Sequence, residues 1–522
     1  MNKDNLKNNR IKRGYIKLKS NNNLDYIYKL KNSLLDQEIL DCKKTFGLSK
    51  NLIEKTIKQF FLQRILHLNF NEKVLISLDR EKKIKIGLPK SLLIWLSEKE
   101  NFKSLTFFNF LRWKKIVLFW FLVGIYFSFL YFRKLLSSKN KNFQFSQFVY
   151  FDNLDSKSFP KKFKNSKTII NWYLDRINEG KIDLVLHDSQ KTVPLESNGI
   201  PIEYSSFPFV LKINNRLKFK YFFNVSKAIF DSLISMLKGN PIPALLLKEY
   251  PLLFLSRQID SKGVAKKYFF HNSVPMYKPL WTHIVEKLGS KTFMYFYSTN
   301  NRILDIAEKN HIRCGHREYM TWNNFYVWNQ SQKDYIKYFF PKSNTEVVGP
   351  IWFQSNNIEI QGIDKNKKII SIFDVQPYTE YFYYRLALPV EYYTPNVVMK
   401  FHEDIFKTFS DCKDFQLVLK RKRTNSLVDK SYLAYVNKIY NSESFIQVSP
   451  DIDPFSLISI SFATINLPAT STALVSTEMN KKTVYFDPTK MVKKTDKSLS
   501  DIPLISGFDK LIEWRASLNQ FT

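Results

Sequence analysis

Cysteine and glycine are scarce in this sequence. Its three cysteines, Cys42, Cys314 and Cys412, are odd in number and far apart, and none belongs to a Cys-x-x-Cys pair. This spacing predicts neither a disulfide framework nor a zinc site, and it suits a reducing cytoplasm. The chain has only 13 glycines and lacks a Gly-x-Gly-x-x-Gly fingerprint, which argues against a typical dehydrogenase.

Acidic residues are also few. The chain has 47 Asp and Glu against 80 Lys and Arg, which gives a formal net charge of +33. Such a balance ordinarily indicates a nucleic-acid or anionic membrane partner. The abundance of Lys, Asn, Ile and Phe is typical of an AT-rich genome, so part of this charge reflects codon bias. The length of 522 residues leaves room for two or three domains.

No secretory signal is visible, because the first residues, Met1 to Lys19, are polar and basic with no apolar stretch behind them. One long apolar run exists, from Ile116 to Phe132, between Lys114-Lys115 and Arg133-Lys134. Its length is at the lower limit of about 17 residues for a membrane span, and basic and aromatic flanks suit an interface anchor. We therefore expect the chain at the cytoplasmic face of the inner membrane. The run forms either a shallow monotopic helix or a true span, and the alternative is a helix buried in a protein core.

The pattern along the chain predicts an α/β protein in three parts. Residues 1–140 read as a mostly helical region that contains the apolar helix 116–132 and no recognisable chemistry. Residues 141–355 alternate strands with helices, which predicts a Rossmann-like domain. Residues 356–522 predict a second Rossmann-like domain.

A hydroxyl-rich turn is the most informative feature of the second domain. The string Leu467-Pro468-Ala469-Thr470-Ser471-Thr472-Ala473-Leu474 precedes a short helix and a strand that closes on Tyr485-Phe486-Asp487-Pro488. Such a turn places the hydroxyls of Thr470, Ser471 and Thr472 at the positive end of a helix, where a phosphate is stabilised. An ordinary helix cap would explain only one of the three hydroxyls.

This ordered string resembles the motif of the bacterial surface-polysaccharide biosynthesis proteins named after a Pro-Phe-Thr-Ser (PFTS) sequence. Here Ala469 replaces the family's Phe, and Phe486 stands where a Tyr is common. The resemblance runs from about residue 250 to the C-terminus. It implies the GT-B architecture of a glycosyltransferase, in which the first Rossmann-like domain (141–355) holds an acceptor and the second (356–522) binds a nucleotide-sugar donor. We expect a truncated chain that starts near residue 140 to be soluble and to bind nucleotide. The implied acceptor is a glycan or a lipid-linked molecule, and we expect an inverting reaction.

A basic cluster, Lys420-Arg421-Lys422-Arg423, follows the predicted strand Phe415–Leu419. Lys420, Lys422 and Arg423 would neutralise the donor phosphates at the carboxyl end of that strand. The alternative is a solvated basic turn. The resemblance implies a basic Lys-x-Lys-Arg at this strand end. Bacterial sialyltransferase-like enzymes carry a Lys-Pro-His-Pro motif there. Here Arg421 and Lys422 replace the Pro and the His, so a catalytic His is not available at this position.

Other candidate site residues are less strongly indicated. Ser476 and Glu478 lie on the helix after the hydroxyl turn and are candidate ribose ligands, although Glu478 is about 10 Å beyond Ser471 along the helix axis. An inverting transfer needs a base for the acceptor hydroxyl, and His271, at a strand end, is the first choice. Asp374, after the first strand of the second domain, is the alternative base. His316 and His402 are interpreted as surface or satisfied histidines.

No metal or cofactor is expected. An Asp-x-Asp pair is missing from the predicted strand ends, because Asp451-Ile452-Asp453 is better explained as the turn before a helix. Two other function classes stay open. An RNA-binding, maturase-like protein shares the charge and the aromatics, although no nucleic-acid partner is expected here. A polyol-phosphate transferase of the teichoic-acid type shares the fold and the membrane contact.

Overall fold

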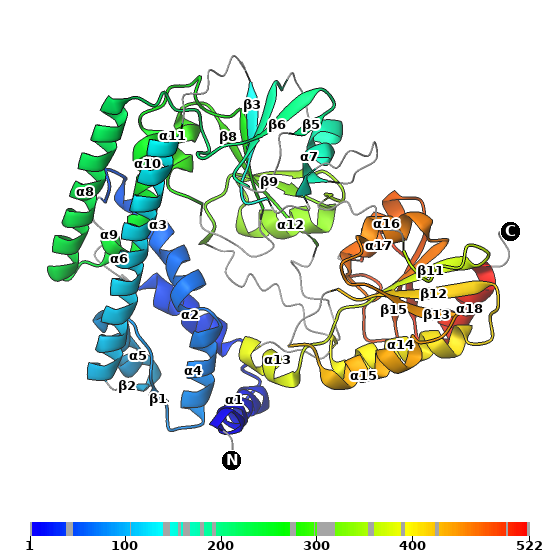
Figure 1. Ribbon diagram of the computed structural model, residues 1–522. Coiled ribbons are helices and arrows are strands. Elements are labelled where there is room, and N and C mark those ends of the chain that lie inside the picture. Colours follow the sequence, from blue (N-terminus) through cyan, green and yellow to red (C-terminus); the bar gives the residue numbers. More distant parts are fainter. Residues whose placement is uncertain are drawn as a thin grey trace.

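The computed structural model describes the following residues: 3–37, 45–104, 106–138, 147–154, 158–159, 168–177, 182–189, 195–271, 278–296, 298–299, 319–352, 360–387, 392–422, 427–496 and 499–518. A helical region and two sheets of parallel strands make up the molecule (Figure 1). The predicted α/β fold, with two Rossmann-like domains after a mostly helical region, is confirmed. The domain boundaries themselves stay a prediction.

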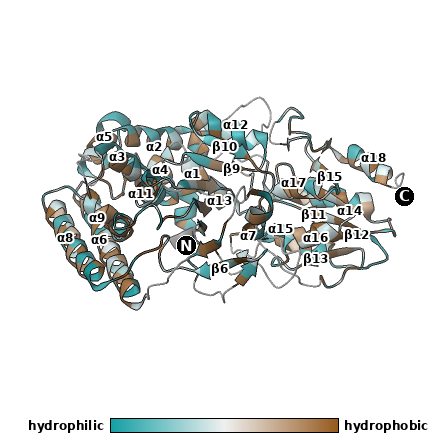
Figure 2. Cartoon of the chain, turned by 90° about the horizontal axis from the view of Figure 1, so that it is seen from above, coloured by the Kyte–Doolittle hydropathy of each residue, from teal (hydrophilic) through white to brown (hydrophobic). Residues whose placement is uncertain are grey.

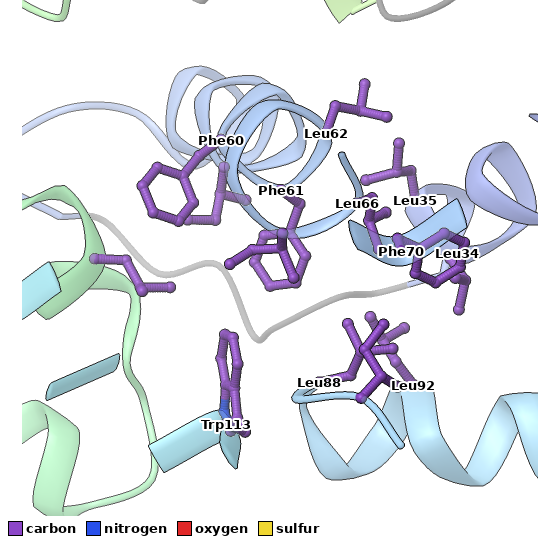
Figure 3. Close-up of a cluster of buried hydrophobic side chains, with 14 of the residues drawn as sticks. Leu34, Leu35, Phe60, Phe61, Leu62, Leu66, Phe70, Leu88, Leu92 and Trp113 are labelled. Carbon is purple, nitrogen blue, oxygen red and sulfur yellow. The ribbon is translucent and has the colours of Figure 1, made fainter. Parts of the chain in front are cut away.

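The helical region is not a separate layer of the protein. It contains α1 (Lys3–Ser20), α2 (Tyr26–Asp36), α3 (Lys50–Phe60), the π-helix η1 (Phe61–Ile65), α4 (Leu68–Leu78), α5 (Lys90–Glu100) and α6 (Thr106–Ser137), with a small parallel pair of strands, β1 (Lys83–Ile84) and β2 (Lys103–Ser104). Buried side chains from several of these elements, such as Phe61, Leu92 and Trp113, form one cluster (Figure 3).

The same cluster includes residues from elements between the strands of the first domain. These elements are α8 (Asn215–Leu237), α9 (Ile242–Leu246), the 3-10 helix η4 (Leu247–Glu249) and α10 (Tyr250–Ser256), which contribute Ala228, Ile242, Leu247 and Leu253 to the core. A chain truncated to begin near residue 140 would expose this shared core to water. The shared core therefore argues against the expectation that such a truncated chain is soluble. The sequence pattern did not predict this, because it does not reveal which helices share a core.

Within the described residues, the first sheet has eight strands in the order β10-β9-β8-β7-β3-β4-β6-β5, of which only β5 is antiparallel to its neighbour. The strands are β3 (Phe148–Phe151), β4 (Leu184–His187), β5 (Leu195–Ser197), β6 (Ile200–Tyr204), β7 (Lys267–His271), β8 (Lys291–Tyr295), β9 (Asn324–Val327) and β10 (Asn344–Val347). They are connected through α7 (Ile169–Trp172), the π-helix η3 (Tyr173–Ile177), α11 (Thr282–Lys287) and α12 (Gln330–Phe339), besides α8 to α10. Strand order reverses between β3 and β7, which makes this the switch point of the sheet.

The second sheet has six parallel strands in the order β13-β12-β11-β14-β15-β16. They are β11 (Lys368–Phe373), β12 (Phe415–Lys420), β13 (Phe445–Val448), β14 (Ala463–Asn466), β15 (Lys482–Asp487) and β16 (Leu504–Ser506). The connecting helices are α13 (Glu380–Leu386), α14 (Pro395–Phe409), α15 (Lys430–Ile439), α16 (Pro454–Ile460) and α17 (Ser471–Glu478), and α18 (Phe508–Leu518) follows β16. This is the 3-2-1-4-5-6 order of a doubly wound sheet, whose ligands bind outside the carboxyl ends of the strands at the switch point. Here the switch point lies between β11 and β14.

Helix α13 connects the second domain to the helical region. Ala387, the residue that caps the C-terminus of α13, is buried in the core of that region, and the ring centre of Tyr384 lies 4.8 Å from that of Tyr15. The buried carboxylate of Glu72 pairs with both Arg385 and Lys7. The helical region therefore contacts the second domain as well as the first.

Within the described residues, one helix is long and apolar enough to cross a membrane. It is the segment Phe107–Ser137 of α6, with a mean hydropathy of 1.9, and 22% of its most apolar window is buried inside the protein.

Candidate functional site

The hydroxyl turn lies where the fold predicts a ligand. Leu467 follows β14 directly, and α17 begins at Ser471. Two tyrosines hold the turn, because the Tyr393 hydroxyl donates to the carbonyl of Pro468 over 2.9 Å and the Tyr485 hydroxyl donates to the carbonyl of Thr470 over 3.1 Å. Ala469 adopts a left-handed conformation with φ of 60°, which costs a non-glycine residue free energy. The turn is thus a fixed structure and not a loose connection.

The three hydroxyls of the turn have different partners. Thr470 donates to the carbonyl of Leu467 over 2.9 Å, and Thr472 donates to the side-chain oxygen of Asn466 over 2.8 Å. The Ser471 oxygen accepts from the backbone N–H of Thr299, which follows β8 of the first domain, over 3.0 Å. Ser471 therefore lies where the two domains meet.

Helix α17 also differs from its neighbours at its N-terminus. The side chains of Thr394, Asp429 and Asp453 accept hydrogen bonds from the first turns of α14, α15 and α16. The side chain of the corresponding residue, Thr470, makes no such bond to α17. The Thr470 side chain thus does not accept a hydrogen bond from the backbone N–H groups at the positive end of α17, and an anion would be stabilised there.

The two predicted ribose ligands are engaged elsewhere. Ser476 is fully buried and donates to the carbonyl of Thr472 over 2.8 Å. Glu478 forms an ion pair with Arg176 of η3, and the guanidinium of Arg176 lies 4.6 Å from the ring centre of Trp352. In this conformation Glu478 connects the two domains, and the ribose role of both residues stays a prediction.

The basic cluster divides into an enclosed and an exposed part. The Lys420 ammonium is largely buried and lies 3.3 Å from the carbonyl oxygens of both Arg421 and Pro450. Lys422 is exposed, and Arg423 lies outside the described residues. Because Lys420 ends β12, next to β11, its charge is at the carboxyl edge of the sheet.

Asp374 belongs to a buried polar network below that edge. Its carboxylate accepts from His402 over 2.8 Å and from the Tyr432 hydroxyl, and the other ring nitrogen of His402 lies 2.9 Å from the Tyr440 hydroxyl. The side chains of Asp374 and His402 are both 0% exposed. An enclosed carboxylate cannot reach an acceptor hydroxyl, so the geometry argues against Asp374 as the base. His402 is a satisfied histidine, as expected, and His316 lies outside the described residues.

His271 lies at the switch point of the first sheet. It ends β7, and its Nε2 lies 2.6 Å from the carbonyl oxygen of Asn153, which follows β3. A carbonyl oxygen only accepts, so Nε2 carries the hydrogen and Nδ1 is the nitrogen that would take a proton. Nδ1 is enclosed in the structure, so His271 is a candidate base only for a conformation in which an acceptor reaches it.

The sequence pattern did not predict two carboxylates that lie at the same edge of the first sheet. Asp152 follows β3, and Asp188 follows β4 and accepts from the backbone N–H of Asn153 over 2.8 Å. Burial, and then the nearby charges of Asp188 and Glu249, raise the pKa of Asp152 above its ordinary value. A carboxyl with a raised pKa at a switch point is a candidate base. Its position directly after an apolar strand was the only available signal.

No group of three or more His, Cys, Asp or Glu side chains that could hold a metal ion occurs in the described part of the chain. Independence from metals stays a prediction.

The comparison with protein families decides the classification. Residues 224–515, more than half of the chain, match the family described as "Polysaccharide biosynthesis PFTS motif protein". The chain belongs to this family. The predicted resemblance is confirmed, and it begins somewhat earlier than residue 250. No curated protein sequence matches this PFTS motif protein.

Among solved structures, this PFTS motif protein is similar to an α,α-trehalose-phosphate synthase (UDP-forming) from Burkholderia vietnamiensis, with a TM-score of 0.35 and 9% identity over 72% of this chain and 92% of that one. A co-structure of S. aureus MnaA with UDP gives a TM-score of 0.37 and 10% identity over 72% of this chain and 88% of that one. A putative UDP-N-acetylglucosamine 2-epimerase from Listeria monocytogenes gives a TM-score of 0.32 and 10% identity over 53% of this chain and 70% of that one.

Proposed function

We propose that this PFTS motif protein is a glycosyltransferase that transfers a sugar from a nucleotide-sugar donor to a surface polysaccharide or a lipid-linked acceptor. One observation carries the proposal. In a member of a polysaccharide biosynthesis family, the hydroxyl turn opens α17 at the switch point between β11 and β14, beside the first domain. Switch points of parallel sheets are where nucleotides bind.

In this proposal the donor phosphates lie at the start of α17. The backbone N–H groups of its first turn and the hydroxyl of Ser471 would bind phosphate oxygens. Lys420, Lys422 and Arg423 would add positive charge from the neighbouring strand end, and this charge would stabilise the departing nucleotide. The nucleotide sugar is a substrate, and the proposal calls for no bound cofactor or metal.

The first domain would supply the acceptor side of the reaction. The base takes the proton of the acceptor hydroxyl, the acceptor oxygen forms a bond to the anomeric carbon, and the nucleotide leaves with the electron pair of the broken bond. His271 and Asp152 are the candidate bases, because both lie at the switch point of the first sheet. Attack opposite the leaving group would invert the anomeric centre. Holding both substrates between the domains would supply much of the rate.

A direct assay incubates the full-length protein with a panel of nucleotide sugars and a membrane extract, and mass spectrometry measures nucleotide release and glycan growth. The proposal predicts release from one nucleotide sugar and an enlarged glycan. Adding CDP-linked polyols to the panel separates the teichoic-acid type of transfer. Deleting the gene should alter the surface glycan, whereas a splicing defect with an unchanged glycan would favour the RNA-binding alternative.

A further inference from the structure

Helix α8 has an unusual outer face. One stripe of the helix, which includes Leu217, Tyr221 and Val225, is buried in the protein. On the opposite side, Phe219, Phe223 and Phe230 are 71%, 64% and 60% exposed. Their spacing of four and seven residues places them on one face of the helix. Three phenylalanines in one exposed stripe are unfavourable in water, because each ring would gain free energy on burial.

Helix α6 repeats this arrangement over a greater length. Trp113, Val117 and Phe121 belong to a buried stripe that continues to Leu135. The opposite stripe contains exposed apolar side chains from one end of the helix to the other, namely Leu111, Leu118, Leu122, Tyr126, Phe129 and Leu136. Along its whole length, therefore, α6 has one side against protein and one side open.

The two helices lie side by side at one end of the molecule (Figures 1 and 2). Their contact includes the ring of Phe132, whose centre lies 5.8 Å from that of Phe222, and the Tyr221 hydroxyl, which donates to the carbonyl of Ser128 over 2.8 Å. Both helices pack on the same inner elements, α9, η4 and α10. The exposed stripes opposite the buried ones are therefore both turned away from that inner layer.

Basic side chains accompany this apolar surface. On α8, Lys218, Lys220 and Lys227 lie among the exposed phenylalanines, and on α6 the apolar run is bounded by Lys114-Lys115 and Arg133-Lys134. A pocket of about 340 Å³ opens where α6 meets η1, and its lining combines Arg64 and Lys115 with apolar and aromatic side chains. Aromatic rings next to Lys and Arg suit the interface of a bilayer with anionic headgroups.

The packing of α6 argues against a membrane span. At Gly124, in the middle of the apolar run, an added Cβ would lie 2.6 Å from Leu247 of η4. The charged residues Lys248 and Glu249 follow Leu247 directly, and the Lys248 ammonium lies 5.7 Å from the ring centre of Trp120. If α6 crossed a bilayer, these charges would lie near its centre, where they are costly.

We propose that α6 and α8 together form a docking surface that lies in the plane of an anionic lipid bilayer, and that α6 does not cross it. The exposed phenylalanines of α8 and the exposed stripe of α6 enter the interface, and the surrounding Lys and Arg contact the headgroups. The inference is independent of the proposed enzymatic reaction.

The binding test is flotation of full-length protein with preformed vesicles of phosphatidylcholine containing phosphatidylglycerol. The variant Phe219→Ser/Phe223→Ser/Phe230→Ser should lower vesicle binding by about 100-fold or more, because three rings no longer enter the interface. Lys220→Gln/Lys227→Gln should lower it by roughly fivefold per lysine at low salt, and the effect should fade in pure phosphatidylcholine. The control, Tyr338→Ser/Ile460→Ser, changes exposed apolar side chains elsewhere and should bind like the parent.

If the triple phenylalanine variant binds vesicles as well as the parent, α8 is not part of the docking surface. Failure of the parent to bind vesicles, together with self-association that the triple variant abolishes, would instead assign the face to a second copy of the chain. Circular dichroism checks that the triple variant is folded. We expect it to be, because all three substituted positions are exposed.

The orientation test uses spin labels at Leu111→Cys, Leu122→Cys and Leu136→Cys, with the three native cysteines replaced by serine. Leu111 and Leu136 are about 37 Å apart along the helix axis. A helix in the plane of the bilayer gives three similar, shallow depths. A deep label at position 122 with both end labels in water would show a span and overturn the proposal.

Discussion

The hydroxyl oxygen of Ser471 accepts a hydrogen bond from the backbone N–H of Thr299 over 3.0 Å. The first residue of α17 in the second domain thus touches the segment that follows β8 in the first domain. Both residues lie beyond the carboxyl ends of their sheets. The carboxyl edges of the two sheets therefore meet at the place where we propose that the donor phosphates bind.

Replacing Ser471 should weaken nucleotide binding. In Ser471→Ala the hydroxyl can no longer donate to a charged phosphate oxygen, a bond worth about 1.5 to 3 kcal/mol. Calorimetric titration should show a dissociation constant raised by roughly 10- to 150-fold. Ser459→Ala, which removes an exposed hydroxyl from α16, is the matched control. Equal affinity of Ser471→Ala and the parent would place the phosphate site elsewhere.

The ion pair between Glu478 and Arg176 allows a test of the ribose prediction. Both side chains are partly exposed, so the pair should contribute at most about 1 kcal/mol to stability. If Glu478 acts through this contact between domains, Glu478→Gln and Arg176→Gln should weaken nucleotide binding to a similar extent. A loss confined to Glu478→Gln would show that the carboxylate contacts the ribose directly.

Substituting His271 should lower turnover without loss of stability, whereas substituting Asp374 should lower stability. His271→Gln should leave the melting temperature close to that of the parent and lower turnover by about 10² to 10⁴-fold if His271 is the base. Asp374→Ala leaves the buried His402 and Tyr432 without their acceptor and should cost about 3 to 5 kcal/mol of stability. Urea unfolding and initial rates measure the two effects. A stable Asp374→Ala protein without activity would restore Asp374 as the base.

The buried N-cap of α16 should make stability depend on pH. Burial raises the pKa of Asp453 to about 6 from its ordinary 3.8, although hydrogen bonds from Phe455 and Ser456 act in the opposite direction. Between about pH 4 and pH 6 the folded protein therefore holds a proton that the unfolded chain has lost. The stability contributed at this position is largest below this window and falls by up to about 3 kcal/mol as the pH rises through it.

Asp453→Asn keeps an oxygen for the cap but does not titrate. The unfolding free energy of this variant, relative to the parent, should therefore increase from pH 4 to pH 7. Urea unfolding at several pH values measures the difference, and Asp429→Asn at the cap of α15 is the matched control. A constant difference across the range would contradict the raised pKa.

Local patterns in the sequence were enough to predict the turn and its sheet. A strand, the hydroxyl turn and helix α17 are continuous in the chain, so their order alone places the hydroxyls at a helix end. The contact of Ser471 with Thr299 joins residues 172 positions apart, and no local pattern encodes such a pair. For the same reason Ser476 looked available in the sequence, whereas packing encloses it within the domain.

A thermal-shift screen of the full-length protein with CMP, CDP, UDP and GDP tests for a nucleotide site between β11 and β14. A nucleotide at 100 times its dissociation constant stabilises the folded state by about 2.7 kcal/mol, which corresponds to several degrees in a domain of this size. We expect one of the four to raise the melting temperature of the parent by that amount and to lose the effect in Ser471→Ala/Lys420→Ala. The absence of a shift with all four, or an equal shift in the double variant, would contradict a nucleotide site between β11 and β14.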